Sequence, residues 1–346
     1  MDRKQREQFI LALPKVELHV HLEGTVTPAF WKKLLEKHAE GEAVASLASL
    51  EQRFRYDSFE HFLHVYRDVI FSFKAADDFY ELTRHYLQMA VDQGIRYSEV
   101  MMTPWFLVKQ GIDFHEMMAE IDRAASEMEA KHPIEMKLIF DGPRNFGKEV
   151  VRKVFEMAAS DRTGRVIAVG LGGDEKNYPA PWYKEAFDYA RAQGLGTIAH
   201  AGETAGEQSM LETIQYLKVS RMGHCLGIPQ HSELERLIQE REITLDLCPW
   251  SNVSTAVIER IEDHPMGDYL AREYPITLNS DDPGMFGNSL LKEYHCLADL
   301  HHPSIEQWGR LARHAVQGSF LPRRKKDRLN REIDAICLSI KEHEQC

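Results

Sequence analysis

Four segments of the chain carry side chains that can bind a divalent metal ion. His19 and His21 form an HxH pair, His200 lies in TIAHAGE, His224 in RMGHC and Asp281 in TLNSDDP. Residues two apart on a strand point to the same side, so both imidazoles of the HxH pair can reach one ion. Three imidazoles and a carboxylate suit Zn²⁺ or Fe²⁺ and leave room for a water molecule whose pKa the ion lowers.

A carboxylate suited to proton transfer follows one of these histidines. Glu203 lies three residues after His200, at the expected junction of a strand and a helix. A carboxylate there can act as a general acid or base. It can equally be an ordinary helix-start carboxylate that the helix dipole favours. The spacing alone does not separate these two interpretations.

Short apolar runs precede these chemically active segments and are typical of buried strands. We expect strands at 16–20, 94–101, 136–140, 166–171, 196–199, 221–222, 243–247 and 276–278, of which the sixth is weak. Stretches with helical periodicity lie between most of them, at 114–131, 148–159, 182–193, 207–217 and 232–240. Short buried strands that alternate with helices indicate βα units and a parallel sheet.

Eight such strands predict an α/β fold, a TIM (β/α)8 barrel whose chemistry lies at the carboxyl ends of the strands. Residues 27–93 are too many for one helix, so they predict a helical insertion after the first strand. Residues 305–317 and 322–344 predict closing helices, and we expect one domain over residues 1–346. An open doubly wound sheet is the alternative, which is disfavoured because no GxGxxG follows an early strand.

Composition argues against several classes of partner. The 346 residues have a net charge of −12, which disfavours binding to nucleic acid through its phosphates. No apolar stretch is long enough for a membrane span. The apolar patch at 9–13 is too short for the core of a signal peptide, and the five cysteines are widely spaced. We therefore expect a cytoplasmic protein without a membrane partner; the oligomeric state is not indicated.

Taken together, five motifs resemble the adenosine deaminase family of the amidohydrolase superfamily. LPKVELHVHLEGT, HAGE, RMGHC, CPWSN and LNSDDP occur in the order of that family, between about residues 13 and 290. The resemblance implies a TIM barrel that holds one divalent metal ion per chain, expected to be Zn²⁺, with Fe²⁺ or Mn²⁺ as alternatives. It also implies hydrolytic loss of ammonia from carbon 6 of an adenine ring, a reaction on a C–N bond of a cyclic amidine. The predicted fourth strand lacks the lysine of the two-metal branch of the superfamily, which favours a single ion.

The resemblance assigns roles to residues that match the family motifs. The metal ligands that it implies are His19, His21, His200 and Asp281. The catalytic residues that it implies are Glu203, which protonates purine N1, His224, which orients the attacking hydroxide, and Asp282, which contacts the hydroxide or the N7 edge. The substrate contacts that it implies are His21, Glu23 near the ribose, Gly173 through its backbone N–H at purine N3, and Asp282.

The expected substrate is a purine nucleoside or base. Adenosine is the default, and the family alternatives are a 5′-modified adenosine, 6-aminodeoxyfutalosine of menaquinone biosynthesis, and adenine. Glu23 near the ribose disfavours AMP, because a carboxylate repels a phosphate. HLEG stands where many adenosine-specific members carry HLDG, so the sugar end of the site is the part in question. A different metal-dependent cyclic amidohydrolase is the alternative from another class of enzyme.

Overall fold

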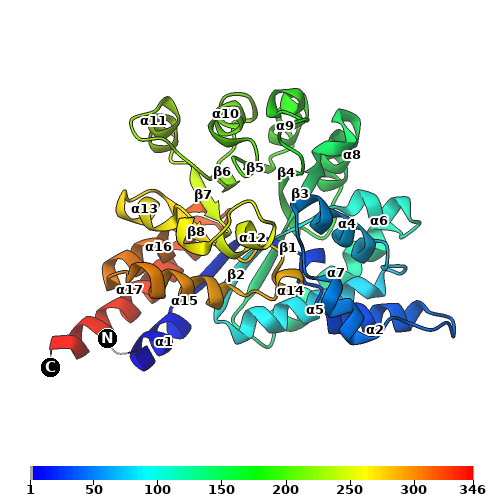
Figure 1. The fold of residues 1–346 in the computed structure, drawn as a ribbon, viewed down its shortest axis with the longest axis horizontal. Coiled ribbons are helices and arrows are strands. Elements are labelled where there is room, and N and C mark those ends of the chain that lie inside the picture. Colours follow the sequence, from blue (N-terminus) through cyan, green and yellow to red (C-terminus); the bar gives the residue numbers. More distant parts are fainter. Residues whose placement is uncertain (1–2, 346) are drawn as a thin grey trace.

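Eight parallel strands form the centre of the structure, a computed structural model that describes residues 3–345 (Figure 1). They pair in chain order, each parallel to the next, which confirms the predicted TIM barrel. The strands are β1 (Lys15–His21), β2 (Ile95–Met102), β3 (Glu135–Pro143), β4 (Val166–Gly172), β5 (Gly196–Ala201), β6 (Arg221–His224), β7 (Thr244–Leu247) and β8 (Ile276–Leu278). The weak sixth strand of the prediction is therefore present.

Helices surround this barrel, and most of them were expected. The predicted helices correspond to α7 (Phe114–Glu129), α8 (Lys148–Ala159), α9 (Lys184–Ala192), α10 (Gly206–Glu212) with its π-helical continuation (Thr213–Leu217), α11 (Glu233–Glu240), α16 (Ile305–Gly318) and α17 (Arg323–Gln345). Those without a predicted counterpart are α1 (Arg3–Ala12), α6 (Pro104–Lys109), α12 (Pro249–Ser254), α13 (Met266–Ala271), α14 (Pro283–Phe286) and α15 (Leu290–His301). Several of these are only four to six residues long, too short for periodicity to reveal them.

The expected helical insertion lies between β1 and β2. It consists of α2 (Pro28–His38), α3 (Leu47–Arg53), α4 (Phe59–Ile70) and α5 (Asp77–Asp92), which gather on one side of the barrel in Figure 1. Side-chain caps define where these helices begin: Thr27 and Ser58 each accept a hydrogen bond from the backbone N–H three residues later. The shortest of the four, α3, is only seven residues long.

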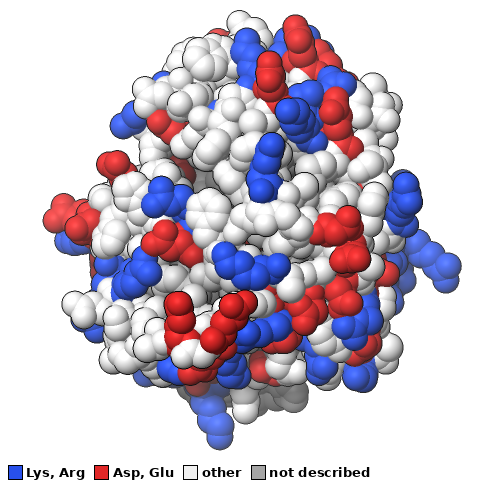
Figure 2. Space-filling model, turned by 90° about the vertical axis from the view of Figure 1, so that its right-hand side faces the viewer, with Lys and Arg blue, Asp and Glu red and all other residues white. Residues whose placement is uncertain are grey.

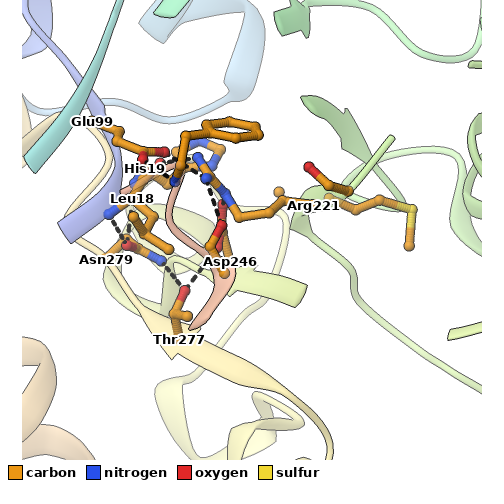
Figure 3. A network of polar contacts seen from close by, with 12 residues as sticks. Leu18, His19, Glu99, Arg221, Asp246, Thr277 and Asn279 are labelled. Carbon is orange, nitrogen blue, oxygen red and sulfur yellow. Dashed lines mark hydrogen bonds and ion pairs between the residues drawn. The ribbon is translucent and has the colours of Figure 1, made fainter. Parts of the chain in front are cut away.

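The seam between β1 and β8 closes the barrel through few contacts. Val20 and Asp281 form an isolated parallel bridge, and the His21 N–H donates to the Asp281 carbonyl at 2.8 Å. The Asn279 side chain adds a second link, because its Oδ1 accepts from the backbone N–H groups of Leu18 and His19 at 2.8 and 3.1 Å (Figure 3). These bonds fix the backbone of the HxH strand against the end of β8.

A buried ion-pair network lies below the seam. Arg221 contacts Glu99 at 2.5 Å and Asp246 at 2.9 Å, and all three side chains are buried (Figure 3). Its third nitrogen donates to the Leu18 carbonyl at 3.1 Å. Removing one partner of a buried pair leaves an uncompensated charge, so this network ties β2, β6 and β7 to β1.

Two surface properties bear on partners. No helix within residues 3–345 is both long and apolar enough to cross a bilayer. On the face drawn in Figure 2, basic and acidic side chains lie next to one another, so this face mixes charges of both signs.

Candidate active site

Five predicted side chains converge where β1, β5, β6 and β8 end. His19, His200, His224 and Asp281 each offer a ligand atom, and these atoms lie within 4.8 Å of one another. The fifth side chain is His21, whose Nε2 is 3.3 Å from Nε2 of His200 and 3.4 Å from Oδ1 of Asp281. Residues that are far apart in the sequence thus form one cluster at the carboxyl ends of the strands, as predicted.

The donor set fits a divalent ion. Within the described part of the chain, neither nitrogen of the buried His19 ring has a hydrogen-bond partner, which is costly for a polar group unless a ligand completes it. The Nδ1–H of His200 donates to the Leu171 carbonyl at 3.2 Å, which leaves Nε2 for coordination. Burial lowers the pKa of His21 to about 4 and that of His200 well below its usual value. Both rings are therefore neutral near pH 7, the form that binds metals.

The tightest set of four contains His224 where the prediction has His21. His224 accepts a hydrogen bond at Nδ1 from Asn252 Nδ2 at 3.1 Å, so its Nε2 is the nitrogen that remains. His21 is close enough to belong to the set as well. The assignment of His21 as a ligand and His224 as a catalytic residue stays a prediction. Metal analysis of His21→Ala and His224→Ala shows which of the two side chains the ion requires.

Asp281 is held by a residue of the CPWSN motif. Ser251 donates to Oδ2 at 2.6 Å, which leaves Oδ1 near the imidazoles, 3.3 Å from His19 Nε2. Burial alone would raise the pKa of Asp281, but the neighbouring imidazoles, His19 foremost, hold it well below its usual range. Asp281 is therefore ionised, as a metal ligand must be. The sequence analysis recognised CPWSN as a motif but gave no role to Ser251 or Asn252.

Two residues of the cluster have a backbone conformation that L-residues rarely adopt. His224 has φ +66° and Asp281 has φ +62°, both in the left-handed region. Such conformations cost about 1–3 kcal/mol and persist where the surrounding structure enforces them, often at functional sites. His224 is the last residue of β6 and Asp281 follows β8, so both conformations occur where a short strand ends. No spacing rule in the sequence predicts them.

Glu203 lies inside this cluster and not in the first turn of a helix. Its Oε1 is 3.8 Å from His224 Nδ1, and its side chain is only 7% exposed. The following helix, α10, begins later, at Gly206. Burial raises the pKa of Glu203 to about 7, against the attraction of His224. A carboxyl with a pKa near the working pH suits a general acid–base role.

A second buried carboxylate, Glu175, holds the turn that carries Glu203. Glu175 accepts from the backbone N–H groups of Gly202, Glu203 and Thr204, at 2.7, 2.9 and 3.2 Å. It also accepts from the Ser209 hydroxyl of α10. Four donors thus converge on one carboxylate. Glu175 lies in the LGGDE segment after β4, where the sequence analysis singled out only Gly173.

Arg144, which follows β3, hydrogen-bonds the backbone next to the same turn. It is fully buried and donates to the carbonyl of His200 at 2.8 Å and to that of Leu171 at 3.4 Å. Its charge also attracts the carboxylates of Glu175 and Glu203. The backbone on either side of His200 is therefore fixed by an arginine and a carboxylate that the sequence analysis did not identify.

The predicted substrate contacts lie beside the cluster. Glu23 is fully buried; one carboxylate oxygen accepts from the Thr103 N–H at 3.1 Å, and the other has no partner among the described residues. Burial raises its pKa to about 7. Burial and the charges of Asp281, Glu23 and Glu203 raise the pKa of Asp282 well above its usual range. These carboxyls carry protons more readily than ordinary ones, so they can donate as well as accept.

Two glycines next to these residues have specific requirements. A Cβ on Gly24 would overlap the carboxylate of Asp282, so only glycine leaves that side chain its place. Gly173 follows β4 with φ +101°, and a Cβ there would collide with the Asn145 side chain. The predicted contact of the Gly173 N–H with a substrate stays a prediction.

Aromatic side chains of the insertion approach the cluster. Tyr56 and Phe62 pack on Phe286 of α14, with ring centroids 5.8 and 5.0 Å apart, and α14 directly follows Asp282. Burial and the charges of Glu23 and Asp282 raise the pKa of Tyr66. Tyr56 and Phe62 thus pack against the helix that begins directly after Asp282.

Comparison with known proteins agrees with this geometry. A model of the family described as adenosine deaminase matches residues 14–336. The chain is 34% identical to aminodeoxyfutalosine deaminase of Streptomyces coelicolor, over 94% of this chain and 85% of that protein. It is 30% identical to adenine deaminase of Sphingopyxis alaskensis, over 96% and 98% of the two chains. The crystal structure of adenine deaminase from Arthrobacter aurescens has a TM-score of 0.87 and 26% identity, covering 93% of this chain and 98% of the other.

Proposed function

Because the chain belongs to the adenosine deaminase family, whose members hydrolyse C–N bonds of cyclic amidines, we propose that it removes the 6-amino group of a purine nucleoside as ammonia. Within this class we propose aminodeoxyfutalosine as the first substrate to test and adenosine as the second. Two aminodeoxyfutalosine deaminases, from Streptomyces coelicolor and Streptomyces avermitilis, are 34% and 33% identical to the chain.

The observation that carries this proposal is the position of Glu203. A buried carboxyl with a pKa of about 7 lies 3.8 Å from His224 and three residues after His200. An aromatic amine is a poor leaving group until water has added to the ring, so the reaction needs an acid beside the ring nitrogen. Glu203 would give its proton to purine N1 as water adds and recover one when ammonia leaves.

The other residues of the cluster hold the reactants. His19, His21, His200 and Asp281 are the proposed ligands of a divalent ion, with Zn²⁺ as the first expectation. When bound, such an ion supplies Lewis-acid chemistry that makes water nucleophilic near neutral pH. His224, held at Nδ1 by Asn252, would orient the attacking oxygen. Asp282 would accept or donate at the same oxygen or at the N7 edge of the ring.

The sugar end of the substrate is where the candidates differ. Glu23 has one unpartnered oxygen within the described residues and would accept from a hydroxyl of the nucleoside. A free base makes no use of that contact. A phosphate at the same place would meet several carboxyls, which disfavours nucleotides.

Adenine is the second candidate function. Adenine deaminases are 28–32% identical to the chain, only slightly below the aminodeoxyfutalosine deaminases. Nothing in the catalytic cluster requires a sugar, so both activities would use the same chemistry.

A substrate panel tests the proposal. The purified protein, loaded with Zn²⁺, is incubated with aminodeoxyfutalosine, adenosine and adenine, and ultraviolet absorbance follows the change from amine to oxo product. We expect the largest kcat/KM for a nucleoside. Adenine as the best substrate would support the second candidate, and no turnover of any 6-aminopurine would refute both.

A further inference from the structure

Asp141 is a carboxyl of the barrel interior to which no role has yet been given. It lies on β3 two residues after Ile139, and Ile139 packs inside the barrel with Met101, Ala168 and Ile198. Side chains two apart on a strand share a face, so Asp141 belongs to the next layer towards the carboxyl ends. His200 has the same relation to Ile198 on β5. Asp141 and His200 are thus in one layer.

Two glycines on the neighbouring strand make room for this carboxyl. Asp141 pairs with Gly170 on β4, and Gly172 follows on the same face. A Cβ on Gly170 would overlap Oδ1 of Asp141, and a Cβ on Gly172 would overlap Oδ2. The Cβ on Gly172 would also lie 3.4 Å from Cε1 of His200. The carboxyl therefore occupies the space between β4 and the histidine cluster.

The Asp141 side chain is buried but incompletely bonded. It is 5% exposed, and its Oδ1, the oxygen on the Gly170 side, has no hydrogen-bond partner among the described side chains. Such an atom is rare in a folded protein and indicates a missing partner. Arg144 attracts its charge, whereas Glu23 and Asp281 repel it.

Thr103, at the end of β2, joins Asp141 to the proposed sugar end. Its N–H donates to Glu23 at 3.1 Å, and its hydroxyl donates to the Asp141 backbone carbonyl at 3.1 Å. Thr103 thus contacts the Glu23 carboxylate and the Asp141 backbone, and each of these two carboxyls has an oxygen without a partner among the described residues. The chemistry given above to the purine ring uses neither of these oxygens.

We propose that Asp141 is a specificity-determining residue that hydrogen-bonds a ribose hydroxyl of the substrate, next to the hydroxyl bound by Glu23. This inference rests on the proposed nucleoside deamination. It assigns the β3 side of the barrel mouth to the sugar. A free base cannot make this contact, so Asp141 separates nucleosides from adenine.

The contact between Asp141 and a ribose hydroxyl is tested by a double-mutant cycle, in which one change removes the side chain and the other removes the hydroxyl. Wild type and Asp141→Ala are compared on adenosine, 2′-deoxyadenosine, 3′-deoxyadenosine and adenine. We expect Asp141→Ala to raise KM for adenosine about tenfold or more and to leave adenine nearly unchanged. One of the two deoxynucleosides should show the same loss with wild type and no further loss with the variant, because the two changes remove one contact. Losses that add, or equal losses on adenine and adenosine, would overturn the proposal.

Two further variants protect the test from trivial explanations. Gly170→Ala keeps the carboxyl but displaces it, so it should change nucleoside preference in the same direction. Asp188→Asn removes a carboxylate from an exposed ion pair on α9 and should leave every KM unchanged. Zinc content and Tm of each variant are measured alongside, and loss of zinc from Asp141→Ala would make Asp141 a support of the metal site, against the proposal.

A binding measurement distinguishes failure of this inference from failure of the proposed function. Purine riboside, which has no amino group to lose, is titrated calorimetrically into wild type and Asp141→Ala, and its 2′- and 3′-deoxy forms follow. If Asp141 binds a ribose hydroxyl, the riboside should bind Asp141→Ala more weakly than wild type. This holds whether or not the protein turns over adenosine. Equal affinity of both proteins for all three ribosides would refute the contact, and turnover data alone would refute the reaction.

Discussion

Glutamine in place of Glu175 tests whether a carboxylate outside the reacting cluster sets the position of Glu203. Oε1 of Glu175 accepts from the N–H groups of Glu203 and Thr204, and Oε2 accepts from Gly202 and the Ser209 hydroxyl. Glutamine keeps one oxygen and replaces the other by a donor. The least disturbed orientation puts the NH₂ at the Ser209 side, because a hydroxyl can turn to accept. The Gly202 N–H is then left without an acceptor.

A buried N–H donor that has no acceptor costs about 1–3 kcal/mol of free energy. If the turn moves to relieve that cost, Glu203 moves with it, and each ~1.4 kcal/mol lost from transition-state stabilisation lowers the rate about tenfold. We therefore expect Glu175→Gln to lower kcat about 10- to 100-fold with little change in KM. Steady-state kinetics on the best nucleoside, with zinc content and Tm measured on the same samples, checks this expectation.

Ser209→Ala is the matched control, because it removes one donor to the same carboxylate and leaves the three backbone bonds. Its kcat should fall less than that of Glu175→Gln, since the N–H groups of Gly202, Glu203 and Thr204 keep their acceptors on Glu175. Glu175→Asp should recover part of the activity because it restores the acceptors. A Glu175→Gln protein with a lower Tm but normal kcat would refute the reasoning, since the turn would then hold Glu203 without the carboxylate.

Four other expectations concern the metal, the acid, the sugar end and the pH dependence of stability. Chelation should abolish activity and elemental analysis should give one ion per chain; His200→Ala should lose the ion, and two ions per chain would contradict the site. Glu203→Gln should keep the ion and lose about 10²–10⁴ in kcat, and retained turnover would remove it from the mechanism. Glu23→Ala should raise KM for nucleosides far more than for adenine, and equal losses would place Glu23 elsewhere. Burial lowers the pKa of Lys15 to about 7, so the folded state binds fewer protons than the unfolded state between about pH 7 and 10.5. The free energy of unfolding should therefore rise with pH in this range. Lys15→Met should flatten that slope by about 1.4 kcal/mol per pH unit in urea titrations, and an unchanged slope would refute the assignment.

The architecture could be predicted because it depends on local patterns. Apolar runs of two to eight residues separated by helical periods specify βα units, and parallel strands have few ways to connect. The strand ends were less predictable. The structure extends β3 from the predicted 136–140 to Glu135–Pro143, because backbone pairing with β2 and β4 continues beyond the apolar run. Short helices such as α12 and α14 were not predicted, because four to six residues are too few to show a helical period.

The chemistry of the site followed from sequence where residue type and motif were enough. Residue type and motif predict six side chains of the site, since imidazoles and carboxylates that follow strands have few other uses in such numbers: His19, His21, His200, His224, Glu203 and Asp281. Their convergence is a consequence of the barrel, which brings every strand end to one rim.

What only the tertiary structure decided is which groups support that chemistry. Glu175 and Arg144 act through contacts between β3, β4 and β5, and Ser251 and Asn252 through contacts of α12 with two other loops. The left-handed backbone at His224 and Asp281 likewise has no local cause. Such contacts join residues 25 or more positions apart, and their energy depends on burial and on three-dimensional distance. The sequence alone therefore specified the candidate reactive groups, whereas folding decided their neighbours, their protonation and the space that two glycines leave for Asp141.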